Sequence, residues 1–283
     1  MSAVRLHLTP IVVAKALAVM VLWTVAETAF TEMPPLLAIG WLLLLLGAFG
    51  WLSLRWAPAC RGVRCRALLR LRKPGAAAVA ALAAAILIFC FQLAIACLLV
   101  HYGQLRLQVP DHGVVQQYLN RRWGWAPVAV SFVFVAPIIE EFVFRGWIQH
   151  SLERRIGTWP AIGIAAALFA AVHGNGPADA FHFVFGVLAG YLVYATGSIW
   201  AGVLLHAGNN LSVMIAGLLL PERLGTPDGM VSTLGVWPLA VVAVVSGVLL
   251  LRLAGALPVR RRRPHWMWSA RPARPGLVQH GAG

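Results

Sequence analysis

Three ionisable side chains interrupt a hydrophobic segment in the middle of the chain: Glu140, Glu141 and Arg145. The residues before them, 126–139, carry no charge. A charged side chain at the centre of a bilayer costs about 2.5–3.5 kcal/mol on insertion scales. Such groups are kept where they pair with one another or face a polar cavity, so a functional site is the first hypothesis for this segment.

The helical period gives the two glutamates different neighbours. Glu141 and Arg145 are four residues apart, so they share one helix face and can form a charge pair. Glu140 points about 100° away from Glu141, where Arg145 is less well placed to reach it. A carboxylate that no cation neutralises can serve as a general base. The alternative is that all three groups form an ion-pair cluster that only packs helices together.

Two later hydrophobic segments also carry polar side chains. Phe169 and His173 lie one helical turn apart, and so do His206 and Asn210. The imidazole and the carboxamide of the second pair can both donate hydrogen bonds toward a common point. Taken alone, either motif can equally hold helices together as polar contacts within a membrane. His182 lies near the start of the hydrophobic segment between these two, and we expect it to pack against neighbours or to form a hydrogen bond with a loop.

The composition is that of a polytopic membrane protein. Of the 283 residues 60% are hydrophobic and only 11% are charged, whereas soluble domains carry about 25% charged residues. The formal net charge of +14 raises nucleic acid as a partner. The basic residues, however, form short runs between apolar segments, which is a topology signal, so we exclude nucleic acid. The four cysteines form no CxxC pair and are assigned no chemistry.

Eight hydrophobic segments approach the length of about 20 residues that a membrane span needs. They lie at 11–30, 36–54, 76–100, 126–149, 160–174, 180–195, 198–219 and 234–256. The fifth and sixth are short, and glycines and a proline break the chain between them, so irregular or re-entrant segments are expected there.

With both termini in the cytoplasm, eight spans place the basic runs at 55–73, 153–155 and 260–263 on the cytoplasmic face. The loop at 101–125 is the one weak disagreement. By helical rise, Glu140 and the two histidine motifs then lie roughly 12–20 Å deep, at one level. The sequence therefore predicts an all-α fold, a transmembrane helical bundle of about eight spans with an active site buried in its core.

The order EExxxR, FxxxH, HxxxN on three hydrophobic segments resembles the CPBP family of intramembrane proteases. This family includes the CAAX prenyl endopeptidases and bacterial bacteriocin-processing and immunity proteins. The run Phe144-Arg145-Gly146 also fits the usual FRG of the family. The resemblance covers about residues 126–215. It implies an endopeptidase that hydrolyses a peptide bond near the membrane in a protein or peptide substrate, with the lipid bilayer as its other partner.

The resemblance implies roles for the site residues. Glu140 and His173 would activate a water that attacks the scissile carbonyl. His206 and Asn210 would stabilise the oxyanion of the tetrahedral intermediate.

Glu141 and Arg145 would fix the helix and tune Glu140. A second mechanism stays open, because Glu140, His173 and His206 could together supply a zinc triad. There is no HExxH motif, and a carboxamide suits an oxyanion better than a metal. We therefore expect no cofactor, with zinc as the alternative.

The chain is divided by this interpretation into four parts. They are N-terminal spans with a basic cytoplasmic loop (1–125), a CPBP-like catalytic core (126–219), a last span (220–257) and a basic, disordered cytoplasmic tail (258–283). Arginine greatly outnumbers lysine, which is typical of a GC-rich bacterial genome. The expected location is thus the bacterial inner membrane.

Two other functions remain open on the sequence. A proton- or cation-coupled transporter could use buried Glu and His residues as a relay. Transporters usually show repeat symmetry, however, and here the polar groups lie only in the second half. A non-catalytic immunity or scaffold protein is the other alternative. The intact Glu140, His173, His206 and Asn210 argue against it.

Overall fold

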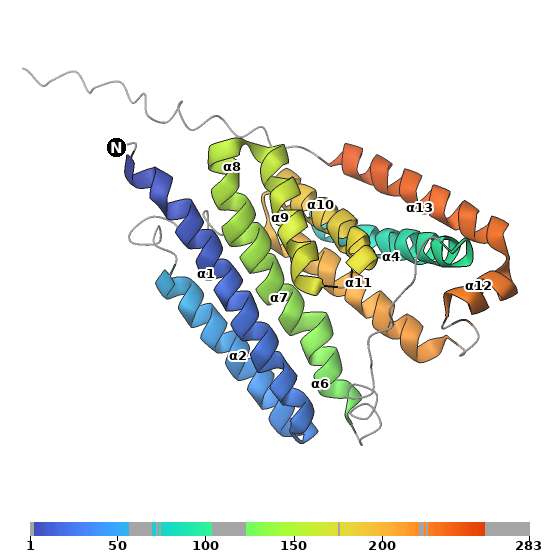
Figure 1. The fold of residues 1–283 in the computed structure, drawn as a ribbon, viewed down its shortest axis with the longest axis horizontal. Helices are drawn as coiled ribbons and strands as arrows, with labels where there is room; N and C mark the ends of the chain where they lie inside the picture. The colour runs from blue at the N-terminus through green and yellow to red at the C-terminus, as the bar shows by residue number, and fades with distance from the viewer. Residues whose placement is uncertain are drawn as a thin grey trace, which may run out of the picture.

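The computed structural model describes residues 3–56, 70–71, 73, 75–103, 123–174, 176–220, 224 and 226–257. Within these ranges the protein is helical and contains no strand, which confirms the predicted all-α class (Figure 1). Cys60, Cys65 and the predicted tail from residue 258 lie outside the described residues, and so does most of the basic loop.

The long helices coincide with the eight hydrophobic segments. They are α1 (Ala3–Thr28), α2 (Pro35–Trp56), α4 (Ala77–His101), a continuous helix from Trp125 to Ile156, α9 (Thr158–His173), α10 (Asp179–Thr196), α11 (Ile199–Leu219) and α13 (Val236–Ala256), with the short α12 (Pro227–Leu234) before the last. In the described chain five helices are long and apolar enough to cross a membrane, while α1, α2 and α9 contain shorter apolar stretches. A topology of eight spans stays a prediction.

The long helix contains two π-helical stretches. It consists of α6 (Trp125–Ala129), the π-helical η2 (Val130–Val135), α7 (Ala136–Glu141), the π-helical η3 (Phe142–Gln149) and α8 (His150–Ile156). Pro137 lies in the first turn of α7. It has no N–H, and its ring clashes with the carbonyl four residues earlier. Proline therefore interrupts the α-helical hydrogen-bond pattern at this turn. A π-helical stretch, such as η2 directly before it, accommodates the missing hydrogen bond.

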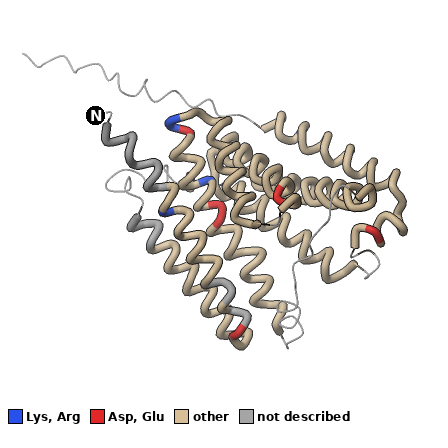
Figure 2. The backbone as a smooth tube through the Cα atoms, viewed as in Figure 1, with Lys and Arg blue, Asp and Glu red and all other residues tan. Residues whose placement is uncertain are grey.

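The long helix lies at the centre of the molecule. On one side it contacts α1 and α2, and on the other it contacts α9 and α11 (Figure 1). The α9–α10 pair packs against η3, and α11 lies between α10, α4 and the long helix. α4 also packs against α13. Most of the described chain is uncharged, and acidic and basic positions lie close together on the middle of the long helix (Figure 2).

Two glycines of α10 accept hydrogen bonds from side chains of η3. Gly186 and Gly190 are four residues apart, and their carbonyls accept hydrogen bonds from Arg145 Nη2 at 3.3 Å and Gln149 Nε2 at 3.0 Å. Small residues at this spacing let membrane helices approach closely. The motif EExxxR is thus packed against a glycine face that the sequence analysis did not identify.

The predicted basic loop meets the end of the long helix. The Arg70 guanidinium pairs with the Glu153 carboxylate, and both side chains are buried. The sequence predicted that the loop after the second segment and the end of the fourth lie on one side of the membrane. This contact shows that the two lie close together, and their side of the membrane stays a prediction. It also corrects the view of Arg70 as only one of several topology charges, since this side chain is buried.

Replacing Gly186 by alanine should lower the melting temperature. A Cβ at this position would lie 3.0 Å from the Ala166 Cα, which belongs to the backbone of α9 and cannot rotate away. Overpacking of this kind costs about 1–3 kcal/mol. Thermal unfolding in detergent would measure the effect, with Gly163→Ala on α9 as the control, because nothing lies within 4 Å of a Cβ there. Equal melting temperatures for the two variants would contradict the packing argument.

Candidate functional site

The predicted charge pair between Glu141 and Arg145 is confirmed. Arg145 Nη1 donates to Glu141 Oε1 at 2.8 Å, and neither side chain has any exposed surface. The second guanidinium nitrogen bonds the Gly186 carbonyl. The guanidinium carbon also lies 4.6 Å from the centre of the Phe169 ring, a cation–π distance. The buried arginine therefore has a partner on three different elements.

His206 joins the two glutamates from the opposite helix. Its Nδ1 lies 3.1 Å from Glu141 Oε1, and its Nε2 lies 3.9 Å from Glu140 Oε2. Glu140 keeps 14% of its side-chain surface exposed, whereas Glu141 has none. The two carboxylates thus differ as the helical period predicted. Glu141 is bound to Arg145, and Glu140 is the more exposed of the two and lies near Nε2 of the His206 ring.

Phe169 connects the three motifs. Its ring centre lies 4.6 Å from that of His173 and 5.7 Å from that of His206. Because Arg145 lies over the same ring, residues from α9, η3 and α11 meet around one aromatic side chain. The predicted convergence of the three polar motifs is confirmed.

The tautomer of His173 follows from its hydrogen bond. Nδ1 lies 2.7 Å from the Phe169 carbonyl oxygen. A carbonyl can only accept, so Nδ1 carries the hydrogen and Nε2 presents a lone pair when the ring is neutral. His173 is partly exposed at the end of α9, so this lone pair is able to accept a hydrogen bond from a water molecule.

Asn210 makes a contact that the sequence did not predict. Its Nδ2 donates to the main-chain carbonyl of Phe132 at 2.7 Å. The side chain lies one turn beyond His206 on α11, and both residues are buried. One of the two amide hydrogens is therefore used within the protein, and the other remains for any further acceptor.

His182 belongs to the site, although the sequence analysis assigned it only to packing or to a loop bond. Its ring stacks on that of His173, with centres 4.1 Å apart and an angle of 21° between the planes. Its Nδ1 lies 3.4 Å from Asp179 Oδ1, one turn earlier on α10. Stacking does fit the expectation of packing, but the partner is a site residue. No helical spacing relates positions 173 and 182, because α9 ends at His173 and His182 belongs to the next helix, α10.

The zinc alternative can be tested against the positions of the side chains. Within the described residues no group of three or more His, Cys, Asp or Glu side chains is close enough together to hold a metal ion. Glu140, His173 and His206 lie in one region, but they do not form a metal-binding cluster. The geometry gives zinc no support, and the metal-free mechanism stays a prediction.

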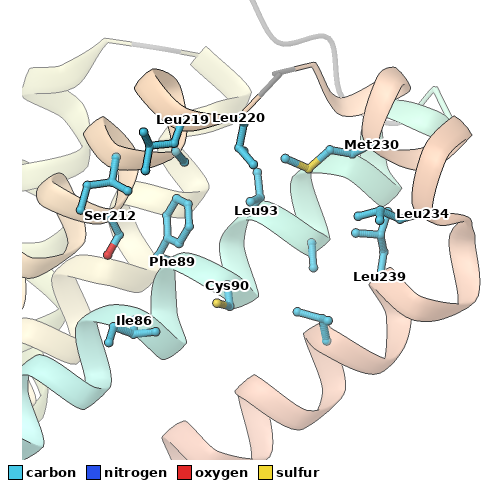
Figure 3. Close-up of a pocket in the computed structure, with 14 residues that line it drawn as sticks. Ile86, Phe89, Cys90, Leu93, Ser212, Leu219, Leu220, Met230, Leu234 and Leu239 are labelled. Atoms are coloured by element: carbon cyan, nitrogen blue, oxygen red, sulfur yellow. The ribbon is translucent and has the colours of Figure 1, made fainter. Parts of the chain in front are cut away.

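A separate apolar cavity of about 570 Å³ lies between α4, α11, α12 and α13 (Figure 3). Its lining includes Phe89, Leu93, Ser212, Leu219 and Met230. The one hydroxyl among these five, that of Ser212, donates to the Gly208 carbonyl at 2.8 Å. None of the six predicted site residues lines this cavity.

Gly202 is a second residue that the sequence analysis missed. A Cβ there would lie 2.7 Å from Glu141 Oε2 and 2.7 Å from Val193 Cγ2. We expect Gly202→Ala to lower both the melting temperature and any activity, because the methyl group pushes the buried carboxylate away from His206. The matched control is Gly217→Ala on the same helix, where a Cβ meets nothing within 4 Å. That change should be neutral, or stabilising by up to about 1 kcal/mol. A Gly202→Ala protein that melts like this control would show that the close approach is not needed.

Comparison with known proteins bears on this same region. Residues 122–212 match the family model described as type II CAAX prenyl endopeptidase Rce1-like. No curated protein and no solved structure matches the chain. The matched segment contains all six residues of the predicted site. The resemblance read from the three motifs is confirmed for this segment, and together with the long apolar helices it indicates an integral membrane protein.

Proposed function

We propose that the protein is an intramembrane endopeptidase that cuts a protein or peptide substrate near the membrane. The observation that carries the proposal is the different state of two adjacent glutamates. Glu141 is bound by Arg145, while Glu140 lies beside His206 and keeps some exposure. Hydrolysis needs a carboxylate that water can reach and a second group that holds it in place. The family match supports the reaction class.

In the proposed reaction Glu140 and the His173 Nε2 orient one water molecule. Glu140 takes a proton from it as the water oxygen bonds to the scissile carbonyl carbon. The carbonyl oxygen becomes an oxyanion, which donors from His206 and Asn210 stabilise. The C–N bond then breaks, the nitrogen takes up the proton from Glu140, and a carboxylic acid and an amine leave.

His206 can act as an oxyanion donor in only one way. Its Nδ1 faces the Glu141 carboxylate, which accepts, so an N–H at Nε2 requires that both ring nitrogens carry hydrogen. The two carboxylates on either side of the ring supply the counter-charge for such an imidazolium. This assigns Glu141 a second task besides the pair with Arg145.

We further propose that the Arg70–Glu153 end of the bundle faces the cytoplasm of a bacterial cell, with both termini on that side. The match to a protease family does not favour a transporter.

Removing the proposed base should abolish cleavage. Glu140→Gln should lower kcat by about 10²–10⁴-fold, the usual contribution of general acid–base catalysis, and His173→Ala should lower it as well. The assay uses the full protein in liposomes with a library of membrane-anchored tail peptides, and mass spectrometry identifies the cut sites. Glu32→Gln and His101→Ala are the controls, since both side chains are exposed and contact none of the site residues.

Two further outcomes of this assay would change the proposal. Loss of wild-type cleavage on adding a chelator, with recovery on adding zinc, would replace the metal-free mechanism. Well-folded wild-type protein that cuts no peptide would favour the non-catalytic or transporter alternatives.

His182 should act as a positioning residue for His173. His182→Phe keeps a flat ring against His173, whereas His182→Ala removes the stack. We therefore expect kcat to fall in the alanine variant with KM unchanged, and to recover largely in the phenylalanine variant. Steady-state kinetics would measure both constants. Equal loss in the two variants would instead assign the role to the polar ring and its contact with Asp179.

A further inference from the structure

The bond from Asn210 to the Phe132 carbonyl needs a physical reason. A carbonyl in the interior of a helix normally accepts from its own backbone, and few are left for side chains. Phe132 lies within η2, three residues after the end of α-helical α6 and five before Pro137. Its carbonyl nevertheless accepts from Nδ2 of a side chain on α11, at 2.7 Å.

Neither helical register supplies a main-chain donor for this carbonyl. In an α-helix the donor would be the N–H of Ala136, but that N–H donates to the Ser131 carbonyl, five residues earlier. In a π-helix the donor would belong to residue 137, which is proline and has no N–H. The Phe132 carbonyl is thus left for a side chain.

We propose that Pro137 is a positioning residue for Asn210. By withholding an N–H it turns the Phe132 carbonyl into an anchor, and this anchor fixes the rotation of the buried carboxamide. The second amide hydrogen then points in one set direction. Pro137 and Glu140 both belong to the short α7, so the base and the anchor of the oxyanion donor are held by one segment of the chain.

The catalytic consequence rests on the proposed function, but the anchor itself does not. The first test is therefore a double-mutant cycle, in which the melting temperatures of the full protein and its variants are measured in detergent. Asn210→Ala leaves the Phe132 carbonyl without a donor and should lower the melting temperature by several degrees. In a Pro137→Ala background a new N–H at residue 137 can take over, so the same Asn210→Ala change should cost clearly less. Equal losses in both backgrounds would overturn the proposal.

Pro127→Ala is the matched control. This proline lies in the first turn of α6, where backbone N–H groups have no helical partner in any case. The cost of Asn210→Ala should be the same with or without the change at 127.

A second variant covers the case in which Pro137→Ala does not fold. Asn210→Leu keeps about the volume of the side chain but has no hydrogen to donate. It should lower the melting temperature, because the Phe132 carbonyl is left without a donor. A melting temperature equal to that of the wild type would show that the donated bond contributes nothing, and the proposal would fail.

The same variants separate this inference from the proposed function. With a cleavable peptide, Pro137→Ala should lower kcat roughly 10- to 100-fold with KM unchanged, the size expected when a catalytic group is slightly misplaced. Adding Asn210→Ala should then cause little further loss. Wild-type kcat in Pro137→Ala would overturn the positioning role. If no preparation cleaves, the proposed function fails, and the melting cycle alone decides on the anchor.

Discussion

The ion pair between Glu141 and Arg145 is the constraint on which the rest of this structure depends. Both side chains are wholly buried, and removing one partner of such a pair typically costs about 3–5 kcal/mol, because the other charge is left uncompensated. Each of the two side chains has further partners besides the other. The arginine also bonds the Gly186 carbonyl and lies over Phe169, and the glutamate also contacts His206. Each of these contacts brings in a different helix.

A second set of polar contacts lies one turn beyond the ion pair, at the end of the long helix. Gln149 donates to the Gly190 carbonyl at 3.0 Å and to Glu153 Oε1 at 2.9 Å. Glu153 in turn pairs with Arg70, whose own carbonyl accepts the Ile199 N–H at 3.0 Å. That N–H is one of the first donors of α11, which have no partner in their own helix. The start of the helix that carries His206 is thus tied to the end of the long helix that carries the ion pair.

The sequence was sufficient for those parts of the site that depend on a regular helix. The Glu141–Arg145 pair follows from a spacing of four, and the different exposure of Glu140 follows from the 100° step between neighbours. The Asn210–Phe132 bond could not be predicted, because it depends on a π-helical register that the hydrophobic pattern does not reveal. Nor could the stack of His173 on His182, since no periodicity relates residues on two helices joined by an irregular segment.

The length of α9 connects this fold to the proposed chemistry. The helix has 16 residues, so it covers about 24 Å at 1.5 Å per residue, less than the roughly 30 Å of a bilayer core. It ends at His173, where Gly174 adopts a left-handed conformation with φ of 62°. In a membrane, irregular backbone is tolerated only where protein buries it or where it lines a cavity that holds water. The proposed hydrolysis needs such water beside Glu140. A helix that crossed the whole bilayer at this position would provide no such irregular backbone beside His173.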